Sequence, residues 1–211
     1  MTENLNDPFP DLILAYDRAV DYRESLQISD WKKDLRWKFL AGLKQEGRTS
    51  LVDIGAGTGI HALFFQTQGI EVSCIDLSPA LVENCRQKGL PCRALSVLDL
   101  PEIGQTFDAA FALNSLLHIP SSLLPQALSN IAKILATDGL FYWGQYGGEH
   151  REGVYQDDTY QPKRFFSLLE DDQIGEFASR NFTIETFEKI QLENSSPLHF
   201  QSLLLRVKSD E

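Results

Sequence analysis

Three glycines at alternate positions, placed directly after a short apolar segment, are the feature that most constrains the fold of this chain. Residues 51–54 are apolar apart from Asp53, and Gly55, Gly57 and Gly59 follow them. A segment of this kind predicts a short buried strand of a parallel sheet. Glycine has no Cβ, so the backbone after the strand can turn sharply and a ligand can lie against it. The pattern therefore predicts a strand that ends in a ligand-binding turn.

The residues after the glycines predict a helix and a second strand. The helix is expected over 58–68 and is ended by Gly69, with these apolar side chains turned toward the sheet: Ile60, Leu63, Phe64 and Ile70. Residues 71–76 predict the second strand, whose last residue is Asp76. The order of strand, glycine turn, helix, strand and acid is typical of one half of a dinucleotide-binding fold.

Two classes of cofactor fit such a half, but the residues do not suit them equally. A nicotinamide fingerprint, G-x-G-x-x-G or A, can be placed on residues 57–62. Its first glycine should follow the strand at once, whereas Gly55 intervenes here. The carboxylate of Asp53 would also repel a pyrophosphate, and it would attract an ammonium or a sulfonium. A cofactor with an amino group and hydroxyls therefore fits better than a dinucleotide.

The pattern Asp-x-Gly-x-Gly-x-Gly over residues 53–59 resembles motif I of the class I S-adenosylmethionine-dependent methyltransferases. The resemblance extends over about residues 35–190. It implies an α/β fold with a Rossmann-like, doubly wound, mostly parallel seven-stranded sheet, an antiparallel strand in a C-terminal hairpin, and N-terminal lid helices. It also implies S-adenosyl-L-methionine as cofactor, S-adenosyl-L-homocysteine as its product, and no metal.

The resemblance assigns residues to this cofactor. In the family, the acid that ends the second strand binds both ribose hydroxyls, and Asp76 matches it. Leu77 and Ser78 match the residues beside the adenine. Asp99 looks like the acid that takes the adenine amino group, and Leu98 looks like the residue that gives it a backbone contact. The complete set of expected cofactor-binding residues is Asp53, Gly55, Ala56, Gly57, Gly59, Asp76, Leu77, Ser78, Leu98, Asp99 and Asn114.

Apolar periodicity and turn residues place the other elements. Helices are expected over 11–27, over 30–45 with Asp30 as cap, from Pro79 with Ser78 as N-cap, over 123–135 and over 170–180. Strands are expected over 92–97, 107–114, 138–144, 182–190 and 198–207, the last two joined by residues 193–197. Residues 146–163 lack both periodicities and predict a long loop, which in a compact domain is usually functional or mobile.

Length and composition predict a single domain over 1–211, with lid helices in 1–46 and an active-site loop at 146–163. The chain is 43% apolar and has 13 Phe and 3 Trp, so a packed core is expected. It has no apolar run near 20 residues and no charged-then-apolar leader, so we expect a cytoplasmic protein without a membrane span. Neither the four histidines nor the cysteines at 74, 85 and 92 have metal-ligand spacing.

The net charge of −11 bears on the acceptor, because an acidic chain repels the phosphate backbone of nucleic acids. Nucleic acid is therefore disfavoured as a partner. The basic residues at 32, 33, 36 and 38 are expected on the solvent face of the helix over 30–45. The inward face of that helix is expected to consist of Leu35, Phe39, Leu40 and Leu43.

The acceptor site is expected beyond the strand ends, below the N-terminal helices and the inserts after the fourth and fifth strands. Aromatic side chains there suit a small molecule and the cationic sulfonium: Tyr16, Tyr22, Trp31, Trp37, Tyr146, Tyr155 and Tyr160. Tyr22 is the first choice to reach the cofactor or acceptor, and Arg23 is a candidate partner of the cofactor carboxylate. His118, just past the fourth strand, is the best-placed general base, followed by His150 and Glu149.

The sequence thus predicts a methyltransferase of the EC 2.1.1 type that acts on a small-molecule acceptor, as a monomer or homodimer, with His118 and Tyr22 as candidate catalytic residues. Three alternatives stay open. A protein or RNA methyltransferase would share every motif, a nicotinamide-dependent oxidoreductase would prefer a dinucleotide, and a non-catalytic protein on the same fold would bind the cofactor without turnover.

Overall fold

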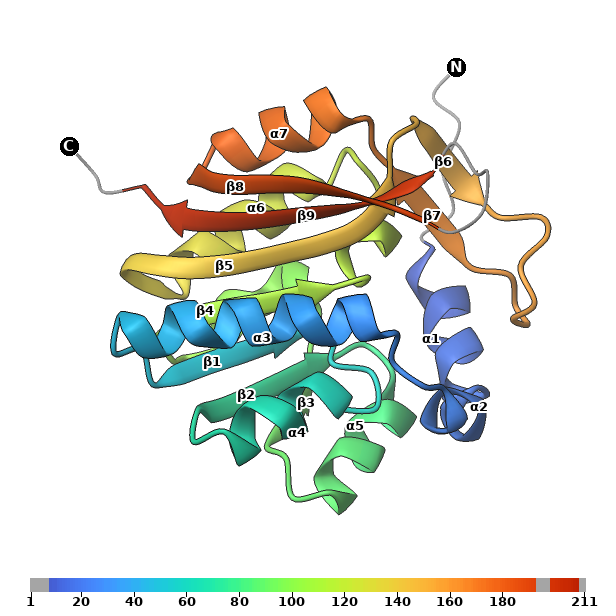
Figure 1. Ribbon diagram of the computed structural model, residues 1–211. Helices are drawn as coiled ribbons and strands as arrows, with labels where there is room; N and C mark the ends of the chain where they lie inside the picture. The colour runs from blue at the N-terminus through green and yellow to red at the C-terminus, as the bar shows by residue number, and fades with distance from the viewer. Residues whose placement is uncertain (1–7, 193–197, 209–211) are drawn as a thin grey trace.

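A seven-stranded sheet forms the centre of the protein in the computed structural model, which describes residues 8–192 and 198–208 (Figure 1). The strands of this sheet are β1 (Ser50–Ile54), β2 (Glu71–Asp76), β3 (Cys92–Ala94), β4 (Phe107–Leu113), β5 (Leu135–Gly147), β8 (Phe182–Gln191) and β9 (His199–Val207). The α-helices are α1 (Phe9–Asp17), α2 (Val20–Ser25), α3 (Asp30–Gln45), α4 (Ile60–Thr67), α5 (Pro79–Gln87), α6 (Leu124–Lys133) and α7 (Asp171–Ser179). Two 3₁₀ helices, η1 (Val97–Ile103) and η2 (Leu116–His118), follow β3 and β4.

The strand order is β3-β2-β1-β4-β5-β9-β8. Strands β1 to β5 pair in parallel, and β9 is antiparallel to both β5 and β8. This confirms the expected mostly parallel sheet with an antiparallel strand from a C-terminal hairpin. The residues expected to join the hairpin, 193–197, lie outside the described residues.

Two apolar cores cover the two faces of the sheet. One contains the inward residues of α3, α4 and α5, and the other contains those of η1, α6 and α7. The four residues predicted to form the inward face of α3 are all buried: Leu35, Phe39, Leu40 and Leu43. Burial on both faces explains why β1 and β4 are near-continuous apolar runs, as parallel strands with helices on both faces require.

The order of the strands fixes where a ligand can bind. The chain leaves β1 toward β2 on one side, and β4 lies on the other side, so the order reverses between β1 and β4. In open α/β sheets, ligands bind at such a reversal, beyond the carboxyl ends of the strands. Figure 1 shows α1 and α2 beyond these ends, so both helices cover the expected site.

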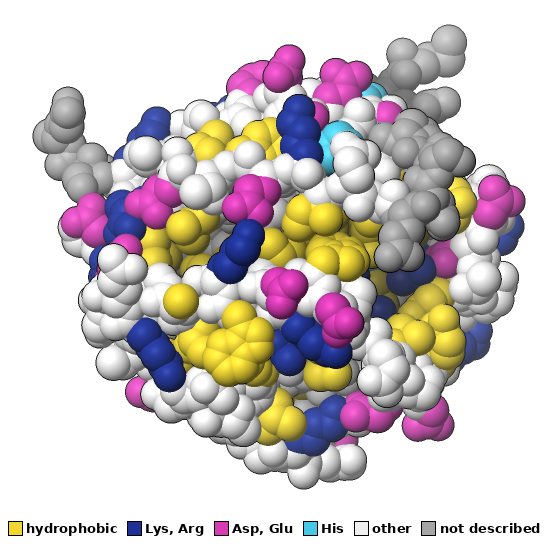
Figure 2. Space-filling view, in the orientation of Figure 1, with side chains coloured by type: hydrophobic (Ala, Val, Ile, Leu, Met, Phe, Trp, Pro, Cys, Tyr) yellow, Lys and Arg dark blue, Asp and Glu magenta, His cyan; other side chains and the backbone are white. Residues whose placement is uncertain are grey.

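The predicted inward face of α4 is wrong for two of its residues. Ile60 is 41% exposed and Leu63 is 37% exposed, whereas Ala62 and Phe65 are fully buried against the sheet. Ile70, after the helix, is buried as expected. Trp37 of α3 is exposed beside these residues and packs on Phe64. Figure 2 accordingly shows hydrophobic side chains at the surface over α3 and α4.

The difference between the predicted and observed inward residues of α4 can be tested by mutation. We expect Phe65→Ala to lower the free energy of unfolding by about 3–5 kcal/mol, because it leaves a cavity in the core. We expect Leu63→Gln to change it by less than about 0.5 kcal/mol, because the side chain faces water. Urea denaturation of both variants tests this, and a large loss for Leu63→Gln with a small one for Phe65→Ala would contradict the assignment.

The N-terminal helix expected over 11–27 is broken in two. The carboxylate of Asp17, the last residue of α1, accepts hydrogen bonds from the Ser78 hydroxyl and the Ala80 amide. This contact holds the end of α1 on the start of α5, and the chain turns at residues 18–19 before α2. The next helix, α3, has Ser29 rather than Asp30 at its N-cap, and Asp30 instead forms an ion pair with Lys33.

Two other expected boundaries are wrong. The strand expected over 92–97 stops at Ala94, and η1 replaces its end. The loop expected at 146–163 is partly regular, because β5 continues to Gly147 and β6 (Arg151–Val154) pairs with β7 (Phe165–Leu168) in a separate antiparallel hairpin. Strands of four residues are too short for periodicity to reveal them. Within the described ranges, no helix has the length and apolar character needed to cross a bilayer.

The three cysteines of the chain lie together in one half of the sheet. Cys74 is in β2, Cys92 is its partner in β3, and Cys85 is on α5 above them. All three are buried free thiols. The thiol of Cys85 donates a hydrogen bond to the carbonyl oxygen of Gly57 at 3.2 Å, so this group packs directly behind the glycine turn.

Candidate functional site

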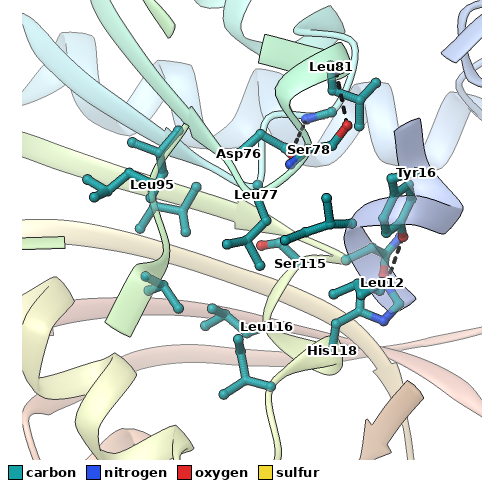
Figure 3. A pocket seen from close by; sticks show the side chains of 18 of the residues that line it. Leu12, Tyr16, Asp76, Leu77, Ser78, Leu81, Leu95, Ser115, Leu116 and His118 are labelled. Carbon is teal, nitrogen blue, oxygen red and sulfur yellow. Dashed lines mark hydrogen bonds between the residues drawn. The ribbon is translucent and has the colours of Figure 1, made fainter. Parts of the chain in front are cut away.

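Two adjoining cavities lie beyond the carboxyl ends of β1, β2 and β4, below α1 and α2. The first cavity contacts the apolar residues Leu12, Ile54, Ile75, Leu95, Val97 and Ile119, together with Asp76 (Figure 3). The second cavity, of about 380 Å³, contacts Lys32, Asp53, His61, Tyr146, Arg164 and Phe166. The lining residues that the two share are Tyr16, Arg23, Gly55, Leu113, Asn114 and His118. The site is thus one continuous hollow with an apolar end and a polar end.

Asp76 holds the glycine turn in shape at the first cavity. Its carboxylate accepts hydrogen bonds from the amides of Gly57 at 2.8 Å and Ser78 at 2.9 Å. Burial raises the pKa of Asp76 above its ordinary value, although these hydrogen bonds lower it. Ser78 in turn caps α5 by accepting a hydrogen bond from Leu81, as its sequence position predicts (Figure 3).

The three glycines of the turn differ in what a side chain at each position would contact. All three have positive φ, but a Cβ on Gly55 would lie 2.3 Å from the Ser115 side chain, and one on Gly59 would lie 2.5 Å from Leu90. A Cβ on Gly57 would meet only Nη2 of Arg23, at 3.4 Å. Gly55 and Gly59 are therefore required by packing, whereas the free side of Gly57 opens toward the cavities.

Unpartnered buried polar atoms gather around the second cavity. They are Nε of Arg23, Oδ2 of Asp53, Nδ1 of His61 and Oδ1 of Asn114, none of which has a hydrogen-bond partner among the described residues. Native proteins pair nearly all such buried groups. A cluster of exceptions at one cavity therefore indicates a polar ligand that completes these bonds.

The charge state of Asp53 is set by its surroundings. Burial, and after it the charge of Asp76, raise the pKa of Asp53 to about 7. A cation placed at its free oxygen would favour the ionised form. Asp53 is therefore suited to receive an ammonium group from a ligand.

His118 belongs to a hydrogen-bonded network at the junction of the cavities. Its Nδ1 lies 2.7 Å from the carbonyl oxygen of Phe165, and its Nε2 lies 2.7 Å from the hydroxyl of Tyr16. A carbonyl can only accept, so Nδ1 carries the hydrogen and Tyr16 donates to Nε2. Burial lowers the pKa of His118 to about 3, against the hydrogen bond to Phe165. The imidazole is thus neutral.

Arg164 completes this network from the other side. Its Nη1 donates to the Tyr16 hydroxyl at 3.1 Å, and its other nitrogens form a bidentate pair with the buried Asp158 at 2.8 and 2.9 Å. Bidentate pairs of this kind are strong and geometrically specific. The sequence pattern did not single out Arg164 or Asp158; their only signal is the run of aromatic residues at 160, 165 and 166 around them.

The cavities bring together most of the predicted cofactor residues. Asp53, Gly55, Ala56, Gly57, Asp76, Leu77, Ser78 and Asn114 line one or both, as does His118. Gly59 lies behind the turn, against Leu90 and Cys85. Leu98 and Asp99 lie outside the lining of both cavities, since the Leu98 amide and carbonyl are bonded to Ser96 and Asn130 and Asp99 is exposed.

Tyr22 is not brought to this hollow. Its side chain is 56% exposed, and its ring packs edge-on against Tyr160 at the opening of a separate depression. Tyr16, six residues earlier in the chain, lines both cavities instead, and Figure 3 shows its hydrogen bond to His118. Arg23 does reach the site, with its guanidinium 5.2 Å from the Tyr16 ring centre and close to Gly57.

These features fit S-adenosylmethionine. The open side of Gly57 leaves room for a ligand, the free oxygen of Asp53 suits its ammonium, and the free Nε of Arg23 suits its carboxylate. The apolar first cavity, with the Asp76 carboxylate at its edge, suits an adenosine moiety. The fold and the site together are those expected from the resemblance to the class I methyltransferases.

Comparisons with known proteins agree with this class. Residues 51–139 match the family model described as a methyltransferase domain. The chain is 30% identical over 104 residues to the O-methyltransferase resE of Aspergillus sclerotiorum, covering 45% of this chain and 39% of that protein. It is 31% identical over 120 residues to glycine N-methyltransferase of Oryctolagus cuniculus, covering 46% of this chain and 41% of that protein. The chain thus spans about two fifths of the length of the curated relatives it matches.

A solved structure of similar fold is 1,6-didemethyltoxoflavin-N1-methyltransferase of Burkholderia thailandensis, with bound 1,6-didemethyltoxoflavin and S-adenosylhomocysteine. It superposes with a TM-score of 0.70 at 21% identity, over 99% of this chain and 94% of that chain. At this identity the likeness is one of fold. Residues 51–139 thus match the methyltransferase domain family, and the chain has the same fold as this solved methyltransferase.

Proposed function

We propose that this protein transfers the methyl group of S-adenosylmethionine to a small-molecule acceptor in the cytoplasm. The observation that carries the proposal is the glycine turn, open at Gly57 and flanked by the unpartnered polar atoms of Asp53 and Arg23. The volume of the second cavity, about 380 Å³, supports a small acceptor, since small-molecule pockets fall in this range. The three free cysteines are in keeping with a reducing compartment.

Each chemical group of the cofactor has a candidate binding residue in the site. Asp53 would hold the ammonium, Arg23 the carboxylate, and Asp76 the ribose hydroxyls, while the apolar first cavity, of about 80 Å³, would receive an edge of the adenine. The bound cofactor supplies an activated methyl group on a sulfonium. The contribution of the protein is then to hold the acceptor in line and to exclude water. We place the acceptor in the second cavity, against Tyr16, His118 and Phe166.

His118 and Tyr16 are placed to take up a proton from the acceptor. The Tyr16 oxygen already accepts a hydrogen bond from Arg164 and has a further lone pair for the acceptor. A proton received there would release the Tyr16 hydrogen to Nε2 of His118. The low pKa of His118 makes it a weak base, which suffices for an acceptor that turns strongly acidic as the methyl group is transferred.

Calorimetric titration with S-adenosylmethionine, S-adenosylhomocysteine and NADH tests the proposal. Micromolar binding of the first two and none of NADH is the expected result. Binding of NADH alone would move the chain to the oxidoreductases. The protein could also bind the first two and methylate a protein or RNA but no small molecule. That result would support the proposed cofactor and contradict the proposed small-molecule acceptor.

The pKa of Asp53 predicts how this binding depends on pH. Asp53 is mostly protonated below about pH 7, and only its ionised form attracts the ligand ammonium. We therefore expect S-adenosylmethionine to bind about 20-fold tighter at pH 7.5 than at pH 5.5, with release of a proton from Asp53 at the lower pH. Titrations in buffers of different ionisation enthalpy measure both effects. A flat profile would contradict the role of Asp53.

A further inference from the structure

Two of the three cationic side chains that line the second cavity have no acidic partner within the part of the chain that the structure describes. Arg23, Lys32 and Arg164 all line it, and Asp53 is the acid among its lining residues. Arg164 is neutralised by its bidentate pair with Asp158. Neither Arg23 nor Lys32 forms an ion pair with any acid of the described residues, although acids outnumber Lys and Arg by 30 to 19 in the sequence.

Lys32 is held in place by aromatic rings and a hydroxyl. Its Nζ lies 5.1 Å from the ring centres of both Trp31 and Tyr146, and 6.0 Å from that of Phe200. The same Nζ donates a hydrogen bond to the Tyr146 hydroxyl at 3.1 Å. Because Tyr146 accepts this bond, its own hydroxyl hydrogen is free to donate, and no partner for it exists in the described part of the chain.

The charges in the cavity can be assigned one by one under the proposed function, on which this step rests. The cofactor ammonium would pair with Asp53, and its carboxylate would pair with Arg23, whose charge also acts on Asp76. Lys32 would remain without an acidic partner among the described residues, next to a hydroxyl with a free hydrogen. The positive field is also felt by His61, whose pKa falls to about 3 through burial first and then through Arg36, Lys32 and Arg23.

We propose that the methyl acceptor carries a carboxylate, which Lys32 and the Tyr146 hydroxyl bind at the polar end of the second cavity. The two donors match a carboxylate, because each of its two oxygens can accept one of their hydrogen bonds. The aromatic faces of Tyr16, Tyr146 and Phe166 along the same cavity suit a planar carbon skeleton attached to that carboxylate.

Matched pairs of ligands that differ only in this charge test the proposal. The protein saturated with S-adenosylhomocysteine is titrated with benzoate and benzamide, salicylate and salicylamide, and indole-3-acetate and indole-3-acetamide. We expect the carboxylate to bind at least about tenfold tighter than the amide in at least one pair, because a hydrogen bond to a charged group exceeds one to a neutral group. Equal binding within every pair, or no carboxylate binding at millimolar concentration, would overturn the proposal.

Two variants on the same helix identify the residue responsible. We expect Lys32→Gln to abolish the preference for the carboxylate and to leave the affinity for S-adenosylhomocysteine within about twofold. Lys33→Gln is the control, because Lys33 is paired with Asp30 and does not line the cavity. An unchanged preference in Lys32→Gln, or loss of S-adenosylhomocysteine binding in it, would refute the assignment. Failure of the wild-type protein to bind S-adenosylhomocysteine would instead refute the proposed function.

Discussion

The replacement Asp53→Asn is expected to stabilise the protein at pH 8 and to weaken S-adenosylmethionine binding at least about tenfold. The folded-state pKa of Asp53, about 7, lies above its ordinary value of 3.8, so the folded protein binds this proton more tightly than the unfolded chain. Stability due to this group is therefore fully present below about pH 4 and is lost as pH rises through 7. Asn does not ionise and suffers no such loss.

The expected gain is about 2–4 kcal/mol in the free energy of unfolding at pH 8, and close to none at pH 4. Urea denaturation at the two pH values measures it, and calorimetry measures the affinity. Asp34→Asn, at an exposed position of α3, controls for the change in net charge. If Asp53→Asn gains no stability at pH 8, the charge of Asp53 does not destabilise the fold. If the variant binds S-adenosylmethionine like the wild type, Asp53 does not bind the cofactor.

The second large effect is expected from Gly57→Ala. The new Cβ would stand on the open side of the turn, 3.4 Å from Nη2 of Arg23, in the space proposed for the cofactor. The φ of +59° at this residue adds about 1–2 kcal/mol of backbone strain for any residue with a Cβ. We expect the affinity for S-adenosylmethionine to fall at least about tenfold while the protein stays folded.

Gly47→Ala separates strain from obstruction. Gly47 has a similar φ of +66°, a Cβ there would meet nothing within 4 Å, and the residue precedes β1 at the opposite end of the strand. The Gly47→Ala variant should lose as much stability as Gly57→Ala and keep the wild-type affinity for S-adenosylmethionine. Equal affinities of the two variants would move the cofactor away from the glycine turn.

The sequence was sufficient for the part of the site that is built from local geometry. The turn after β1, the acid that ends β2 and the Ser78-Pro79 helix start are set by neighbouring residues, so their patterns predict them directly. The antiparallel direction of β9 is expected only from the resemblance to the family, because residues 199–207 do not alternate between apolar and polar.

The contacts that depend on tertiary packing could not be predicted in this way. Helix α4 is apolar on several sides, so its pattern does not decide whether Leu63 or Phe65 faces the sheet. Tyr22 and Tyr16 both lie in the N-terminal segment, and the break between α1 and α2, which Asp17 anchors through Ser78 and Ala80, decides which of them enters the hollow. Arg164 acquires its role only when β6 and β7 pair and bring it beside Tyr16.

The three buried cysteines allow local opening of the protein to be measured by thiol labelling. Each thiol is buried, in β2, α5 and β3, and that of Cys85 is bonded to the carbonyl oxygen of Gly57. A disulfide reagent added to the native protein can react only when this half of the sheet opens, so the labelling rate reports the free energy of that opening alone. A ligand seated on the glycine turn would slow the labelling in proportion to its occupancy. Affinity could thus be followed in mixtures without a labelled ligand or a known acceptor.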